Sequence, residues 1–196
     1  MGTDAVALDQ GLPSRSALLI GVLAGVLVLW LKDWLEADMA RHMLIEFTLL
    51  LVAGTGLGSA LPRRLDALIA RCNQLGLAGF GLASITMTYW MIPVALDAAL
   101  LHGSAAAAKY ATFIVSGALL PRSFRAAPLA LQAFFVGNLA WMMATAGLIY
   151  QNTPQQLCVN YLIDAQSAAG EGLVAAALII ACAWCAHAAP ALLRET

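Results

Sequence analysis

The chain has 196 residues, of which 62% are hydrophobic and only 21 are charged, 10 of them Lys or Arg and 11 Asp or Glu. A soluble domain usually has about 25% charged and 45–50% apolar residues, so this composition excludes a soluble enzyme and a disordered chain. The net charge of −1 gives no basic surface for nucleic-acid phosphates. We therefore expect an integral membrane protein that forms a single domain over residues 1–196.

Apolar runs of about span length follow one another along the chain. They cover residues 16–31, 43–61, 75–92, 105–120, 129–150 and 168–189. Lys32 and Asp33 close the first run, and Pro93 closes the third. Asp4 and Asp9 lie where a cleavable signal has a basic region, so the first run is predicted to be a permanent span. The sequence thus predicts an all-α polytopic membrane helix bundle of about six transmembrane helices.

Basic residues are distributed unevenly between the two predicted faces. One face has Arg15, Arg63, Arg64, Arg71, Arg122, Arg125 and Arg194, and the other has Lys32, Arg41 and Lys109. The positive-inside rule places the first face in the cytoplasm, so both termini are predicted to be inside. Loops 33–42, 93–104 and 151–167 then lie outside. Aromatic residues near that boundary suggest an interfacial belt, namely Trp30, Trp34, Tyr89, Trp90, Tyr150 and Tyr161.

Small residues recur at helical spacing within two of the runs. Gly21 and Gly25 are four residues apart, as are Gly54 and Gly58. This spacing lets helix backbones approach closely in a membrane. It predicts a tight bundle.

Acidic residues inside the predicted spans mark a candidate site, because burying charge in a bilayer is costly. Glu46 and Glu171 are the two cases, both near the outer surface. If the second helix begins before Asp38, then Asp38, His42 and Glu46 share one face at i, i+4 and i+8. Three helices then bring ligand-type side chains to one depth, with Met87 and Met91 on the third span and Asp164 and Glu171 on the last.

These side chains have three interpretations that the sequence does not separate. They are a structural polar network, a metal site, or a proton or quinone site. Methionines at helical spacing more often pack than bind. A haem between two imidazoles requires His42 and His102 at one depth and stays open as an alternative.

Cys182 and Cys185 form a Cys-x-x-Cys near His187. Thiolate and imidazole are soft metal ligands, although cysteine in an alanine-rich helix more often only packs. The sequence does not decide their role. No P-loop, nucleophile elbow or dinucleotide motif occurs in context, which argues against an enzyme.

Three segments together resemble the CtaG-type cytochrome c oxidase assembly proteins, which are polytopic bacterial membrane proteins linked to copper delivery. Residues 41–46 (RHMLIE) resemble the family's His-Met-x-x-His. Residues 90–93 (WMIP), followed by 96–100 (LDAAL), resemble its Trp-His-x-Pro and Asp-x-Ala-Leu. Asp164, Gln166 and Gly170 resemble its Asp-Gln-x-x-Gly-Gly, with the Asp one place out of register.

The chain departs from this pattern at the family's other histidines. Glu46 replaces the second His of the first motif, Met91 replaces the His after Trp90, and Tyr110 stands near the start of the fourth span. The resemblance implies a divergent member in a bacterial cytoplasmic membrane, with copper as the metal. Met91 suits Cu(I), whereas Glu46 suits harder ions.

The favoured function is therefore a non-enzymatic oxidase-assembly or metal-handling protein with an outer-face polar pocket. His42, Glu46 and Met91 are expected to hold the ion, and Asp164 and Glu171 to orient them. The partners would be the bilayer and a haem–copper oxidase or other respiratory complex. The alternative is an accessory structural subunit of such a complex.

Overall fold

The computed structural model describes residues 15–193. All regular elements in this part of the chain are helical. They are α1 (Arg15–Trp30), α2 (Lys32–Glu36), the π-helix η1 (Arg41–Glu46), α3 (Phe47–Ser59), α4 (Arg63–Cys72), the 3-10 turn η2 (Gln74–Gly76), α5 (Leu77–Trp90), α6 (Pro93–Leu101), α7 (Gly103–Ala126), α8 (Leu129–Asn152) and α9 (Ile163–Leu192). The predicted all-helical fold is confirmed.

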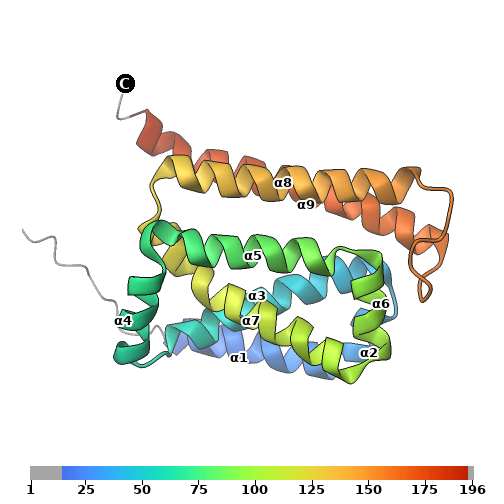
Figure 1. Cartoon of the computed structure of the whole chain (residues 1–196), viewed down its shortest axis with the longest axis horizontal. Coiled ribbons are helices and arrows are strands. Elements are labelled where there is room, and N and C mark those ends of the chain that lie inside the picture. The colour runs from blue at the N-terminus through green and yellow to red at the C-terminus, as the bar shows by residue number, and fades with distance from the viewer. Residues whose placement is uncertain (1–14, 194–196) are drawn as a thin grey trace, which may run out of the picture.

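The long helices run side by side along one axis, and short helices cross the two ends (Figure 1). α3 packs on α1 and α7, α7 packs on α5, and α8 pairs with α9 as a hairpin. α4 crosses one end, which we call the α4 end. α6 crosses the opposite end, the α6 end, next to the loop between α8 and α9 (Figure 1). These two ends correspond to the predicted cytoplasmic and outer faces.

Within residues 15–193, four helices are long and apolar enough to cross a membrane. They are η1 with α3 (Arg41–Ser59), α7, α8 and α9. A fifth span results if Gln74–Trp90 and Pro93–Leu101 count as one segment bent by 80°. α1 has 16 residues, which at 1.5 Å per residue is about 24 Å and short of the ~30 Å core of a bilayer. A sixth span and the N-in/C-in topology stay predictions.

The bend between α5 and α6 follows from Pro93. Proline has no N–H to donate and pushes the preceding residue out of the α region. Ile92 is accordingly extended, and Pro93 takes the first turn of α6. A helix boundary therefore lies at the proline that closes the third predicted run.

Close helix contacts confirm the tight bundle, though not every glycine contributes. A Cβ on Gly21 would lie 2.5 Å from the Cα of Gly56, so α1 and α3 touch backbone to backbone. Gly54 and Gly58 face the backbone of α7 in the same way, whereas Gly25 has only ordinary contact with a side chain. The Gly54/Gly58 pair is thus a packing surface, and the Gly21/Gly25 pair is one only at Gly21.

Several segments outside the predicted spans are helical. α4 lies within residues 62–74, α6 within 93–104, and α7 continues through Pro121 to Ala126. The apolar-run criterion missed them because it detects long uninterrupted runs, and these helices are short or charged. Asp4, Asp9 and Arg194, which entered the predictions on the N-terminus and orientation, lie outside the described residues.

The predicted aromatic belt is half correct. Trp30, Trp34 and Tyr89 are exposed, as a belt requires. Trp90, Tyr150 and Tyr161 are instead buried. Their polar atoms hydrogen-bond inside the bundle, for example from Trp90 Nε1 to Thr112 Oγ1 at 3.0 Å. Sequence position alone does not separate an interfacial aromatic residue from a buried hydrogen-bond donor.

Candidate functional site

Ionisable side chains from three elements meet near the α6 end. Glu36 comes from the end of α2, His42 and Glu46 from η1, and Lys109 from the second turn of α7. His42, Glu46 and Lys109 have no exposed surface, and the Glu36 side chain is 12% exposed. We call these four residues the Lys109 cluster. Four ionisable groups inside an apolar bundle are costly unless they pair with one another.

Lys109 lies at the centre of this cluster. Its Nζ is 2.8 Å from Glu46 Oε1, 3.2 Å from Glu36 Oε1 and 2.8 Å from His42 Nε2. The ammonium hydrogen-bonds to Glu36 Oε1 and His42 Nε2, whereas its contact with Glu46 Oε1 is an ion pair without hydrogen-bond geometry. Two carboxylates and one ammonium leave a charge of −1, and Lys32, 3.8 Å from Glu36 at the surface, supplies the compensating charge.

The contacts of His42 fix its protonation. Because Nε2 accepts from the Lys109 ammonium, the ring is neutral and its proton is on Nδ1. Nδ1 then donates to Tyr161 Oη at 2.7 Å, and Tyr161 Oη donates to the Glu36 carbonyl oxygen at 2.8 Å. Burial, with Glu36 close by, raises the pKa of the Tyr161 phenol above its usual range. The phenol therefore stays a donor, and this chain of bonds ties α7 and η1 to the loop before α9.

Glu46 is the least satisfied member of the cluster. Lys109 Nζ lies at ion-pair distance from Oε1, and His42 Nε2 is 3.4 Å from Oε2. Neither oxygen, however, accepts a well-directed hydrogen bond, and the buried Tyr110 hydroxyl nearby also has none. The Lys109 ammonium offsets the cost of burying this carboxylate, while both of its oxygens keep hydrogen-bonding capacity for a proton or another cation.

The π-helix explains why Asp38 does not join the cluster. The prediction assumed an α-helix starting before Asp38, which would align Asp38, His42 and Glu46. The chain instead bends at Asp38, and residues 41–46 form a π turn. The Asp38 carboxylate accepts from the Arg41 backbone N–H at 3.1 Å and lies 3.8 Å from Arg41 Nε. Single π turns often occur at functional sites.

Three ligand-type residues among the described ones come together as a metal would need. One donor atom each from Glu36, His42 and Glu46 lie within 4.8 Å of one another. Nitrogen and carboxylate oxygen suit divalent ions such as Zn²⁺, Mn²⁺ or Cu²⁺, not Cu(I). The donor set therefore fits a divalent cation, but the Lys109 ammonium contacts all three side chains. A metal ion and this ammonium would compete for the same carboxylates and imidazole.

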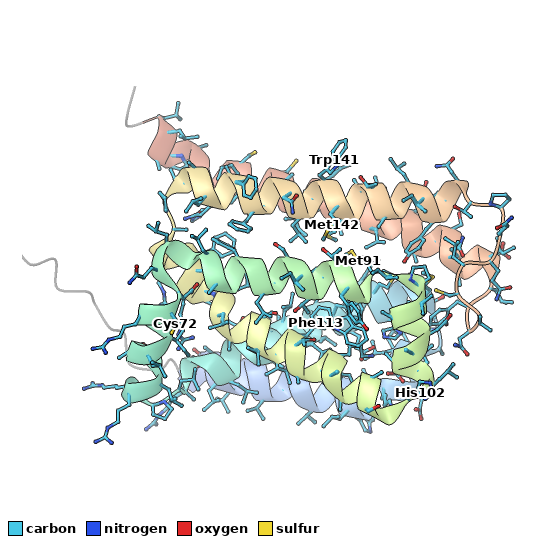
Figure 2. All side chains as sticks on the ribbon, viewed as in Figure 1. Cys72, Met91, His102, Phe113, Trp141 and Met142 are labelled. Carbon is cyan, nitrogen blue, oxygen red and sulfur yellow. The ribbon has the colours of Figure 1, made fainter. Side chains whose placement is uncertain are left out.

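The other predicted ligands lie elsewhere. Met91 is buried in the apolar core, with Met87 packed against that core. The Met91 side chain faces the space between α5 and α8 (Figure 2), where it lines a groove of about 580 Å³ with Met142 and Trp141. Asp164 and Glu171 are exposed on α9. The structure thus brings together only His42 and Glu46 of the predicted set.

Cysteine and the remaining histidines form no second cluster in the described chain. Cys182, Cys185 and His187 are all exposed on α9. His102 is exposed where α6 meets α7, pointing away from the bundle (Figure 2). Both ring nitrogens of His42 already have partners, so a haem held by His42 and His102 would require both residues to rearrange.

The other motif residues fasten the loop between α8 and α9. Asp97 accepts from the Val159 N–H at 2.8 Å and from Asn160 Nδ2 at 2.8 Å. Gln166 accepts from the Leu157 N–H at 2.8 Å and donates to the Tyr150 carbonyl at 3.1 Å. These bonds hold the loop that carries Tyr161 to the cluster, so Asp97 and Gln166 act as positioning residues.

Sequence reasoning missed Glu36, Lys109 and Tyr161. Lys109 carried a usable signal, because a charged residue inside an apolar run is expensive, yet it counted only as a loop charge. Glu36 and Tyr161 carried none, since both lie in short segments between spans. Their contacts depend on the fold of residues far apart in the chain.

Comparison with known proteins adds no family assignment. No family model, no curated protein and no solved structure matches this chain.

Proposed function

We propose that this chain is a multi-pass membrane protein that handles a divalent metal ion at the Lys109 cluster, as part of the assembly of a respiratory oxidase. The observation that carries the metal is the meeting of one imidazole and two carboxylates within 4.8 Å, with the Glu46 carboxylate lacking well-directed hydrogen bonds. The oxidase link rests on the resemblance of residues 41–46, 90–100 and 164–170 to the CtaG-type proteins.

In this proposal His42, Glu36 and Glu46 are the ligands and Lys109 is the resident cation. A neutral imidazole offers one lone pair, which Lys109 now occupies. Two carboxylates neutralise a divalent ion, so the site is balanced only if the ammonium leaves or loses its proton. Metal binding is then coupled to displacement of Lys109. That property suits a protein that holds an ion briefly and passes it on.

Cu²⁺ is the ion that this donor set would bind most tightly, because it heads the affinity order of the divalent first-row metals. Cu(I) would need the thioethers of Met87 and Met91, which belong to the apolar core. The copper expected from the resemblance is therefore proposed as Cu²⁺ at the cluster. Zn²⁺ is the competitor to test beside it.

Metal analysis of the purified protein tests this proposal. Wild type is expected to take up about one Cu²⁺ per chain, and His42→Ala to lose at least about tenfold in affinity, as loss of a ligand interaction of ~1.4 kcal/mol or more requires. His102→Ala is the matched control, because this exposed histidine lies outside the cluster. A wild type that binds no metal, or a His42→Ala protein that binds it equally well, contradicts the proposal.

A second candidate is an accessory subunit of a respiratory complex, without a metal of its own. Lys109 already fills the centre of the cluster and joins α2, η1 and α7, as a permanent structural link would. Exposed apolar residues on α8 and α9, including Trp141 and Ile179, offer surface to a neighbouring membrane protein.

Mild solubilisation followed by purification separates the two candidates. The subunit role predicts a stoichiometric oxidase partner and an unchanged oxidase activity in cells that carry His42→Ala. The metal-handling role predicts lower oxidase activity in those cells, restored by added copper. A protein that purifies alone contradicts the subunit role.

A further inference from the structure

α4 is an amphipathic helix whose apolar side is left mostly uncovered by the rest of the described chain. Leu65, Leu68, Ile69 and Cys72 follow one another at steps of three and four residues, so they share one face. None of the ten residues of α4 is buried. Leu65 is 47% exposed and Leu68 is 56% exposed. Ile69 is only partly buried, so the apolar face contributes little to holding this short helix against the bundle.

The rest of α4 is basic. Arg63 lies on the side opposite the apolar face, and Arg64 and Arg71 lie together along one edge of it, as 100° per residue dictates. Asp66 pairs with Arg122 of α7, whose Nε donates to Asp66 Oδ1 at 2.7 Å. Arg122 also donates to the Gly58 carbonyl at 2.9 Å. This pair fixes α4 at the end of the bundle, and none of the three arginines has an acidic partner among the described residues.

The placement of α4 fits a membrane surface. The long helices run along the axis of the bundle, and α4 runs across their end (Figure 1). If the long helices cross the bilayer, α4 lies in the plane of the interface. Its exposed leucines then continue the apolar surface of the spans, and Cys72 marks its last turn beside the start of α5 (Figure 2).

We propose that α4 is an interfacial helix that immerses Leu65, Leu68, Ile69 and Cys72 in the bilayer and binds the phosphates of anionic phospholipids through Arg63, Arg64 and Arg71. Amphipathic helices with basic polar faces bind membranes in this way. The positive charge complements an anionic leaflet, and each basic residue near it contributes about fivefold to affinity. The inference is independent of the metal proposal.

The test uses the full chain with Cys158→Ala, Cys182→Ser and Cys185→Ser, so that Cys72 is the sole thiol. A bimane label on Cys72 is read in vesicles of phosphatidylcholine, with or without phosphatidylglycerol. Nitroxide lipids quench from the bilayer and iodide quenches from water. The matched control carries the label at Ala67→Cys in a Cys72→Ser chain, because residue 67 faces away from the apolar side. The Cys72 label is expected to be quenched by lipid and protected from iodide, and the residue-67 label the reverse.

The role of the three arginines in binding anionic lipid is tested with quenchers attached to the lipid headgroups. The Cys72 label is expected to be quenched more by headgroup-labelled phosphatidylglycerol than by labelled phosphatidylcholine. Replacing all three arginines by Gln should lower this preference by at least about fivefold, and replacing them by Lys should keep it. Equal iodide access at residues 67 and 72 overturns the immersion. The apolar face of α4 would then be a binding surface for a soluble protein. An unchanged preference in the Gln variant overturns the anionic-lipid binding.

Discussion

Charged residues are buried at one end of the bundle and exposed at the other. At the α6 end, Lys109, Glu46 and His42 have no exposed surface and contact one another within 3.4 Å. At the α4 end, Asp66 is 53% exposed, and its pairing with Arg122 takes place at the surface. Both ends contain carboxylates and cations, so composition does not distinguish them.

The difference lies in what the surroundings do to a charge. A buried charge without its partner costs several kcal/mol, whereas an exposed ion pair contributes about 0–1 kcal/mol. The α6 end therefore depends on a complete set of partners, and any change there is expected to alter stability or bring in another cation. Substitutions of charged residues at the α4 end are expected to cost little stability, and this end can contact the membrane surface.

Removal of the central cation is expected to have the largest effect. Lys109→Met leaves Glu36 and Glu46 buried without their ammonium, which should lower the free energy of unfolding by about 3–5 kcal/mol. Thermal unfolding of the protein in detergent, with a chelator present to remove metal, measures this change.

The control is the double variant Lys109→Met/Glu46→Gln. It removes one carboxylate charge together with the ammonium and should recover most of the lost stability, since replacing both partners is far less costly than breaking a pair. A Lys109→Met protein as stable as wild type would show that the buried carboxylates do not depend on the Lys109 ammonium.

The Tyr161 hydroxyl should have the next largest effect. Tyr161→Phe leaves the His42 Nδ1–H and the Glu36 carbonyl without this partner, and a buried unsatisfied polar group costs about 1–3 kcal/mol. The matched control is Tyr89→Phe, because Tyr89 is exposed at 53%. Equal unfolding temperatures for the two variants would exclude a role of the hydroxyl in the cluster.

Cysteine chemistry compares the same two ends. Burial, and then the charge of Asp97, raises the pKa of the Cys158 thiol to about 12, while residue 67 at the α4 end, the water-facing control position, is exposed. Only the thiolate reacts, so at pH 8 Cys158 should react with a maleimide on the order of a thousandfold more slowly than a thiol of ordinary pKa. Single-cysteine chains measured by mass spectrometry give both rates. Similar rates at Cys158 and at Ala67→Cys would contradict the burial.

The same pKa predicts a loss of stability in alkali. The folded pKa of Cys158 lies above the unfolded value of 9, so the folded state retains the proton. Its contribution is complete below about pH 9 and is lost as the pH rises toward 12. Cys158→Ala should weaken this alkaline dependence, which unfolding curves across that range would reveal.

The smallest effect is expected at the α4 end. Asp66→Asn removes an ion pair whose carboxylate is half exposed, so the stability should change by less than about 1 kcal/mol. Denaturant or thermal unfolding beside Lys109→Met gives the ratio of the two effects. A larger loss for Asp66→Asn than for Lys109→Met would reverse the comparison between the two ends.

The fold was accessible from the sequence where a single signal dominates. Long apolar runs located η1 with α3, α5, α7, α8 and α9, and Pro93 located the bend, because hydropathy and proline geometry act locally. The helix α4 was missed although its residues at 65, 68, 69 and 72 repeat at helical spacing. Short amphipathic segments need that periodicity test in addition to a search for apolar runs.

The site was only partly accessible for a different reason. His42 and Glu46 lie four residues apart, so their meeting followed from the chain itself. Lys109 reaches them across 67 and 63 positions of sequence, a pairing that depends on how α3 packs on α7 through Gly54 and Gly58. The prediction that Asp38 lines up with His42 and Glu46 was also wrong, because it assumed an α-helix and no local sequence pattern predicted the π turn.

The most direct test of the account is the metal content of Lys109→Met compared with wild type, each saturated with Cu²⁺ and then washed. If an ammonium and a metal ion compete for His42, Glu36 and Glu46, then Lys109→Met should bind about one Cu²⁺ per chain at least tenfold more tightly than wild type. His42→Ala in the same background should abolish that gain. A Lys109→Met protein that binds copper no better than wild type would contradict a cation site at this cluster.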